Sequence, residues 1–402
     1  MKRKNFFEVC NFCGVVFCLL YFIGFPSAAI SQESTLTSTP TPTIQLSDKT
    51  LQNDEAIRAY CIDFNWGVGG AHGFAKAGLW ADADPKEHVQ WFAELGCNVI
   101  QTFAVSCNGY AWYKNGVVPE QPGLKHDFLT EIVKLGHKKN MKVFGYFCVG
   151  ANNKWEQEHP DLCYRMNGQQ IPLTQTYLDY LCASIEDAIR KTDMDGFMVD
   201  WFYNPGGGRS PLPKLRWLPC EQKMYQELMG EDFPGKEKIT SEIEIIFRRK
   251  SIERAWQQIK NTTKRVKPNC IIWLTAYEVD SEEYVGTSIL KEVDWLMNEA
   301  GDDKRTRKMR ELSGPKTKLL TCLANWNKQN PLEVIPNAMK QSVGIYGFAK
   351  PTVTVGMPSP VSHYLSKPVG SFKGDDLNIA VLARIFNNLP LDYVSTPTKK
   401  GK

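Results

Sequence analysis

Residues 177–202 read YLDYLCASIEDAIRKTDMDGFMVDWF. The first part, Tyr177 to Lys191, repeats its apolar residues at the spacing of an amphipathic helix. The second part, Gly196 to Phe202, is a short apolar run that is typical of a buried strand. A helix that leads directly into a buried strand is part of the repeating unit of a parallel sheet. This stretch therefore predicts an α/β fold.

The same alternation recurs along the rest of the chain. Eight strand-like runs are Arg58 to Asn65, Asn98 to Val105, Lys142 to Val149, Gly196 to Phe202, Cys270 to Tyr277, Asp294 to Asn298, Lys318 to Ala324 and Val343 to Ala349. Helical segments between and after them are Pro85 to Leu95, Asp127 to Lys138, Tyr177 to Lys191, Glu242 to Val266, Asp303 to Leu312, Leu332 to Lys340 and Asp376 to Asn387. Eight parallel strands joined by helices close into a (β/α)₈ or TIM barrel, which we predict as a single catalytic domain.

An open, doubly wound sheet that binds a dinucleotide would show the same alternation. Such a sheet carries a GxGxxG turn after its first strand. The glycines after the first run, at positions 67, 69, 70 and 73, do not have this spacing. The barrel is therefore the favoured fold.

The N-terminus has the layout of a secretory signal peptide. Lys2, Arg3 and Lys4 precede an apolar run from Val15 to Phe25, and the small residues Ser27, Ala28 and Ala29 follow it. The apolar run is short for a membrane-spanning helix. We predict that residues 1–30 are cleaved, that the protein is secreted or periplasmic, and that no stable membrane anchor remains.

Composition divides the rest of the chain. Residues 31–54 are rich in Ser, Thr and Pro and predict a linker, residues 55–392 hold the barrel, and residues 393–402 form a basic tail. The net charge of +4 gives no strong field for nucleic acid, so we expect a neutral partner and no nucleic acid. The oligomeric state is left open.

Cysteine and histidine usage gives no cofactor pattern. Three of the 12 cysteines lie in the signal peptide, and the nine that remain are an odd number without paired spacing, which predicts mainly buried free thiols. The six histidines form no metal pattern, and His72 is interpreted as a structural loop residue. Cys107 has no histidine at a recognised spacing and is not favoured as a nucleophile. We expect no metal and no organic cofactor.

Acidic residues at the carboxyl ends of the strands are the candidates for catalysis, because barrel enzymes place their active sites there. Asp200 ends the fourth run, Glu278 follows the fifth, Glu299 follows the sixth, and Asp63 lies in the first. Cleavage of a glycosidic bond needs a proton donor and a second carboxylate, which two of these acids would supply. The alternatives are a structural cap for Asp200 and a rim salt bridge for Glu278 or Glu299. Asp195 is expected in the turn before the strand.

Aromatic residues near the same strand ends favour a sugar, because flat rings stack on the apolar faces of sugars. Packing within the loops is the alternative for about half of them. We expect Asp63 and the amide of Asn108 to contact substrate hydroxyls. The aromatic residues predicted to bind substrate are Trp66, Tyr110, Trp112, Trp201, Tyr203, Tyr277 and Trp326.

Several of these segments resemble a known family. The stretch from Val89 to Tyr113, the helix and strand from His126 to Phe147, the segment His159-Pro-Asp-Leu and the strand from Asp195 to Trp201 are similar to the hypothetical glycosyl hydrolases related to glycoside hydrolase family 29, the α-L-fucosidases. The segment Cys220 to Pro234 resembles a Cys-bearing helix of the same proteins.

The resemblance implies a retaining mechanism, with Asp200 as nucleophile and Glu299 as acid/base residue. The chain departs from the fucosidases at Cys107 and Asn108, where they commonly carry histidine, and it lacks their early paired histidines. Glu278 is the runner-up as proton donor. The alternative functions are a catalytically silent barrel that binds glycans, and a transglycosidase or lyase on the same fold.

Overall fold

The computed structural model describes residues 56–67, 74–164, 171–202, 215, 217–351 and 356–395. The predicted signal peptide and linker lie outside the described residues, as do His72 and Tyr203. The predicted barrel domain, residues 55–392, begins one residue before the first described residue and ends within the described part of the chain.

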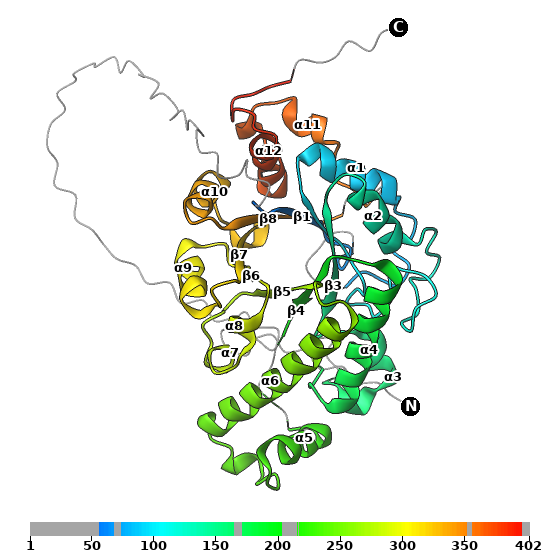
Figure 1. The fold of residues 1–402 in the computed structure, drawn as a ribbon, viewed down its shortest axis with the longest axis vertical. Coiled ribbons are helices and arrows are strands. Elements are labelled where there is room, and N and C mark those ends of the chain that lie inside the picture. Colours follow the sequence, from blue (N-terminus) through cyan, green and yellow to red (C-terminus); the bar gives the residue numbers. More distant parts are fainter. Residues whose placement is uncertain are drawn as a thin grey trace, which may run out of the picture. The chain divides into compact units, whose positions relative to one another are not determined.

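Eight parallel strands close into a barrel in the order in which they occur in the sequence (Figure 1). Their bounds are β1 Arg58–Ile62, β2 Val99–Gln101, β3 Lys142–Cys148, β4 Gly196–Asp200, β5 Ile271–Ala276, β6 Trp295–Asn298, β7 Lys318–Leu323 and β8 Gly344–Ala349. Strand β1 pairs with both β2 and β8, so the ring is complete. Each strand lies within one of the eight predicted runs, and the predicted (β/α)₈ fold is confirmed.

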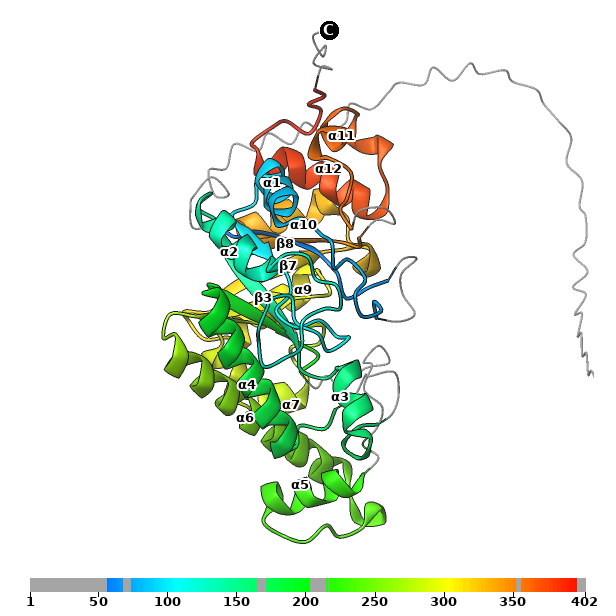
Figure 2. The same ribbon diagram turned by 90° about the vertical axis from the view of Figure 1, so that its right-hand side faces the viewer.

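Helices connect the strands and surround the barrel. The longer ones are α1 Pro85–Leu95, α2 Phe128–His137, α4 Gln175–Thr192, α5 Pro219–Met229, α6 Ser241–Val266, α9 Asp303–Leu312, α10 Pro331–Lys340 and α12 Gly374–Phe386. The shorter ones are α3 Asn153–Glu158, α7 Glu282–Val285, α8 Ile289–Glu292 and α11 Val361–Leu365. Figure 2 shows α4 and α6 lying side by side outside the strands.

Local sequence explains where the helices begin and end. Asp84 accepts hydrogen bonds from the backbone N–H groups of Lys86 and Glu87 and so caps the start of α1, where Pro85 fits the first turn. Gly96 ends the helix at a φ of +86°, a conformation that glycine adopts without strain. A Cβ there would also approach the backbone of Phe386 to 2.9 Å. These signals explain why the predicted bounds of α1 are confirmed.

Aromatic side chains fill the interior of the barrel below its carboxyl-terminal end. The ring of Trp295 on β6 lies 4.6 Å from the ring of Phe144 on β3 and 5.5 Å from the ring of Trp273 on β5, measured between centroids. Tyr346 on β8 contacts Trp273 edge to face. This packed layer fills the barrel interior, so a cavity can lie only above it, at the carboxyl ends of the strands.

All nine cysteines of the described residues are free, and seven of them are buried. The prediction of mainly buried free thiols is confirmed for this part of the chain. Within the same residues, none of the helices combines the length and the apolar character that a bilayer crossing requires.

Candidate active site

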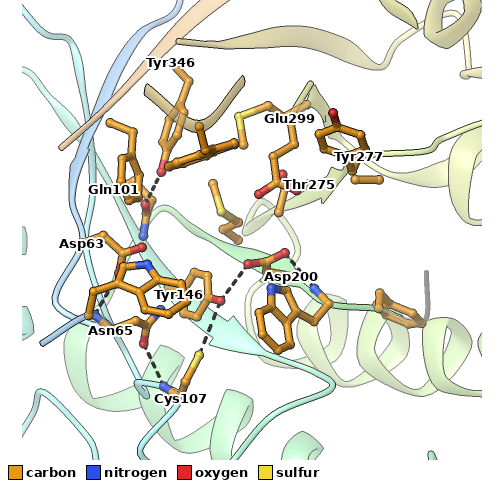
Figure 3. A pocket seen from close by; sticks show the side chains of 18 of the residues that line it. Asp63, Asn65, Gln101, Cys107, Tyr146, Asp200, Thr275, Tyr277, Glu299 and Tyr346 are labelled. Atoms are coloured by element: carbon orange, nitrogen blue, oxygen red, sulfur yellow. Dashed lines mark hydrogen bonds between the residues drawn. The ribbon is translucent and has the colours of Figure 1, made fainter. Parts of the chain in front are cut away.

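A cavity of about 470 Å³ lies at the carboxyl ends of the strands (Figure 3). It is lined by Asp63 just after β1, Asp200 at the end of β4, Glu278 after β5 and Glu299 just after β6. Figure 3 shows the side chains of Asp200 and Glu299 directed into the same space, with Asp63 at another side of it. The structure therefore brings together the four acids that the sequence singled out.

Asp200 is the last residue of β4, and hydrogen bonds fix its carboxyl group. The hydroxyl of Tyr146 donates to Oδ2 at 2.8 Å, and the backbone N–H of Trp201 donates to Oδ1 at 2.7 Å. Burial raises the pKa of Asp200 to about 6, while the hydrogen bond from Tyr146 works in the opposite direction by stabilising the charged form. The carboxylate is thus held in place with both oxygens contacted by a donor.

Trp201 holds a backbone conformation that bulky residues rarely adopt, with φ at +53°. This conformation goes with two contacts: its N–H reaches Asp200, and its ring lies 5.7 Å from that of Phe74. Phe74 in turn lies 5.6 Å from Trp66, so three cavity-lining rings follow one another along one wall. Strained residues next to a cavity are a recurrent mark of functional sites.

Glu299 directly follows β6, and its backbone N–H donates to the carbonyl of Ala276 on β5. Among the described residues no donor contacts its carboxyl group, in contrast to Asp200. Burial, followed by the nearby charges of Asp200 and Asp63, raises the pKa of Glu299 to about 8. At neutral pH this side chain therefore retains its proton when Asp200 is ionised.

Asp63 follows β1 and accepts a hydrogen bond from the backbone N–H of Asn65 at 2.8 Å. Burial raises its pKa to about 7, and the charge of Asp200 adds to the effect. Lys350, which also lines the cavity, lies over the ring of Trp66 and lowers the pKa of Asp63 slightly. Asp63 is thus a third carboxyl group that a ligand in the cavity could contact.

Glu278 lies two residues beyond the end of β5 and is half-buried at the cavity wall. The neighbouring Tyr277 ring packs under the guanidinium of Arg305, which is paired with Asp302. Within the described part of the chain, neither Glu278 nor Glu299 forms a salt bridge, so the rim ion pair is not the role of either acid there. Both acids border the cavity, and the raised pKa of Glu299 suits proton donation.

Four of the predicted aromatic residues line the cavity: Trp66, Trp201, Tyr277 and Trp326. Trp326 is 39% exposed and stands edge to face on Phe348, another cavity residue, at 4.2 Å. Rings thus border the cavity after β1, β4, β5 and β7.

The prediction for the segment after β2 is wrong: Asn108, Tyr110 and Trp112 are not among the residues that line the cavity. The Asn108 amide is buried and exchanges hydrogen bonds with Gln121. The Trp112 ring is 1% exposed, packs 5.0 Å from Phe64 and donates to Ser106.

A reversal of the chain explains the error. Val105 and Ala111 form an antiparallel bridge, so the segment turns back and packs into the loop layer. The sequence shows that these residues follow a strand, but not that the segment reverses.

Several polar residues of the cavity were not predicted. They are Asn65, Gln101, Cys107, Tyr146, Thr275, Tyr284 and Tyr346. Tyr146, Thr275 and Tyr346 lie inside strands with apolar neighbours, and a polar side chain at an inward position of a barrel strand is the signal that would have found them.

Cys107 does not have the features of a nucleophile. Its sulfur lies 3.8 Å from the hydroxyl of Tyr146, and burial raises the pKa of the thiol well above its usual range, which keeps it protonated. Across the described residues, no group of three or more His, Cys, Asp and Glu side chains is placed to hold a metal ion.

Comparison with known proteins adds to this geometry. Residues 84–201 match the family described as hypothetical glycosyl hydrolase 6. The matched segment runs from the cap of α1 to Trp201 and includes Tyr146 and Asp200. The predicted family resemblance is confirmed.

Solved structures share the barrel. The α-L-fucosidase isoenzyme 2 from Paenibacillus thiaminolyticus has a TM-score of 0.55 at 14% identity, with 83% of this chain and 49% of that chain covered. The PgaB (BpsB) glycoside hydrolase domain from Bordetella bronchiseptica has a TM-score of 0.52 at 9% identity, with 85% and 99% covered. The chain thus spans about half the length of the fucosidase and nearly all of the second domain. No curated protein matches the sequence.

Proposed function

We propose that this protein is a glycoside hydrolase in which Glu299 donates a proton to the glycosidic oxygen and Asp200 is the second catalytic carboxylate. The observation that carries the proposal is the contrast between two acids in one sugar-sized cavity. Asp200 receives two hydrogen bonds and has the lower pKa, whereas Glu299 receives none from the described residues and has the higher pKa. Two carboxyl groups whose environments separate their pKa values are the arrangement that acid-assisted glycoside cleavage needs.

The division of labour follows from the neighbours of each acid. Tyr146 and the Trp201 N–H stabilise the negative charge on Asp200, so this group stays ionised and faces the anomeric carbon. Glu299 keeps its proton near neutral pH and releases it as the bond to the leaving oxygen breaks. The family resemblance favours Asp200 as a nucleophile and retention of configuration, which product analysis by NMR would establish.

We propose a neutral oligo- or polysaccharide as the substrate class. Asp200 lines the cavity as a carboxylate together with Asp63 and Glu278, and Lys350 is the one lysine among the described lining residues, so an anionic sugar would meet repulsion. The Trp66 and Trp201 rings supply apolar faces for stacking, and Asp63 is placed to accept a hydrogen bond from a sugar hydroxyl. From the signal-peptide pattern we also propose that this activity lies outside the cytoplasm.

A panel of nitrophenyl glycosides and plant or algal polysaccharides tests the proposal on wild type and on Asp200→Ala. We expect turnover of at least one substrate by the wild type and a loss of about four orders of magnitude in the variant. The variant should still bind the substrate, because the rings and Asp63 remain. Asp195→Ala is the matched control, because Asp195 lies at the opposite end of the same strand and the folded variant should keep its activity.

The alternative functions give other outcomes. A silent glycan-binding barrel would bind members of the panel without turning any of them over. A lyase would yield an unsaturated product, and a transglycosidase would transfer the sugar to an acceptor in place of water. Hydrolysis in heavy-oxygen water must place the label in the released sugar.

A further inference from the structure

The hydroxyl groups that border the cavity differ in how they are bonded. Tyr146 donates to Asp200, Tyr346 donates to Gln101, and Tyr284 donates to the carbonyl of Phe202. The hydroxyl of Thr275 is buried and has no hydrogen-bond partner among the described residues. Thr275 itself lines the cavity and is 3% exposed.

The position of Thr275 places this hydroxyl beside the catalytic acids. It is the fifth residue of β5, the strand that lies between β4 with Asp200 and β6 with Glu299. The next residue, Ala276, accepts the backbone hydrogen bond from Glu299. Figure 3 shows Thr275 close to Glu299 at the wall of the cavity.

An unpartnered buried hydroxyl is unfavourable, because it has lost its hydrogen bonds to water without replacing them. Rotation about the Cα–Cβ bond of a threonine moves its hydroxyl among three staggered positions. Since β5 is paired with β4 on one side and with β6 on the other, the cavity that Thr275 lines is the direction from which a partner for this hydroxyl can come. A hydrogen-bonding partner at this place would lie near Asp200 and Glu299, which line the same cavity from the two neighbouring strands.

We propose that Thr275 is a positioning residue that binds a hydroxylic oxygen between Asp200 and Glu299. This oxygen is a water molecule in the free protein, and a sugar hydroxyl or the attacking water in the complex. The role of the oxygen during turnover rests on the proposed function, whereas the oxygen site of the free protein does not. The inference also supplies a hydrogen-bond partner for Glu299, because an oxygen bound by Thr275 would lie within reach of the Glu299 carboxyl group.

The test compares Thr275→Val, which keeps the shape and removes the hydroxyl, with Thr275→Ser, which keeps the hydroxyl. In crystal structures of the free protein we expect an ordered oxygen about 3 Å from the hydroxyl in the wild type and in the serine variant. The valine variant should lack this oxygen. It should be at least as stable to heat as the wild type, because no protein partner loses a hydrogen bond.

Kinetics on the nitrophenyl glycoside that the wild type hydrolyses best supplies the second readout. We expect kcat of the valine variant to fall about 10- to 100-fold and that of the serine variant to stay within about threefold, because kcat falls when either step is slowed. If the oxygen is the attacking water, the valine variant releases nitrophenol in a burst, because the second step is slowed. If it is a sugar hydroxyl, bond cleavage itself is slowed and no burst appears.

The proposal is overturned if the wild-type structure shows no oxygen at Thr275 and the valine variant keeps the wild-type kcat. It is also overturned if the valine variant loses heat stability, since the hydroxyl would then be bonded within the protein. Absence of turnover on every substrate would defeat the proposed function alone, because the electron density at Thr275 still decides the oxygen site.

Discussion

Acidic residues occur at both ends of the barrel strands, and their surroundings are opposite. At the amino-terminal end, Asp195 accepts hydrogen bonds from the Val143 N–H at 2.8 Å and from His137 at 2.9 Å. Asp294 accepts from the Ile272 N–H at 2.8 Å and from Lys264 at 2.9 Å. Each of these carboxylates bridges its own strand to a neighbour and to a cation or histidine.

At the carboxyl-terminal end, burial raises the pKa of Asp63, Asp200 and Glu299. These carboxyl groups share one cavity, where Asp200 accepts a hydrogen bond from Tyr146 and Asp63 one from the Trp66 side chain. The comparison teaches that acidic residues stabilise the fold at the amino-terminal end of the barrel and destabilise it at the carboxyl-terminal end. Substitutions at the two ends should therefore have opposite effects.

Asp200→Asn gives the largest expected effect. The change removes the charge but preserves the shape, so kcat should fall by about four orders of magnitude while the folded structure is kept. Steady-state kinetics and thermal unfolding on the same preparations measure both quantities. A variant that keeps more than about a tenth of the wild-type rate would contradict the assigned role.

Glu299→Gln should lower kcat by about 10²- to 10⁴-fold on glycosides with poor leaving groups, because the proton donor is lost. Nitrophenyl glycosides with acidic leaving groups should be affected much less, since they need little protonation. The wild-type rate should fall at high pH as Glu299 loses its proton near its pKa of about 8, and this limb should vanish in the variant. Glu278→Gln is the matched control, and an equal loss there would move the assignment to Glu278.

Tyr146→Phe should lower kcat/KM about tenfold, because it removes the hydrogen bond that orients Asp200. The pKa of Asp200 should rise from about 6, since that hydrogen bond favours the charged form. The acidic limb of the pH–rate profile should therefore move to higher pH. An unmoved limb would mean that Tyr146 does not act through Asp200.

Asp63→Asn and Asp195→Asn test stability at the two ends. The folded-state pKa of Asp63 is about 7, which lies above its ordinary value. The wild type therefore loses stability as the pH rises from the ordinary pKa of an aspartate to about 7. Asp63→Asn should thus raise the free energy of unfolding at pH 8 by about 1–3 kcal/mol and change it little at pH 4. Asp195→Asn should lower it by about 1–3 kcal/mol at pH 8. Chemical denaturation at both pH values measures these differences, and equal signs for the two variants would contradict the comparison.

The sequence is sufficient to predict the fold because each strand and helix carries its own periodic signal. The apolar run around Val199 and the helical repeat from Tyr177 do not depend on distant residues. For the same reason Asp63, Asp200 and Glu299 were predicted: a parallel barrel brings the carboxyl ends of all its strands to one face.

The rest of the site depends on contacts between segments that are far apart in the sequence. The segment that contains Asn108 reverses through the Val105–Ala111 bridge, and the backbone N–H of Trp112 donates to the carbonyl of Ala104. Local patterns do not show such a return path. Tyr146 and Thr275 were missed because the register of neighbouring strands decides whether an inward residue meets an acid, and no local pattern specifies that register.

The most direct test of the account follows sugar release in heavy-oxygen water by the wild type, Asp200→Asn and Asp195→Asn. The account predicts labelled sugar from the wild type and from Asp195→Asn, and none above background from Asp200→Asn. Labelled sugar at the wild-type rate from Asp200→Asn would contradict the account, because the cavity acid would then have no part in the reaction.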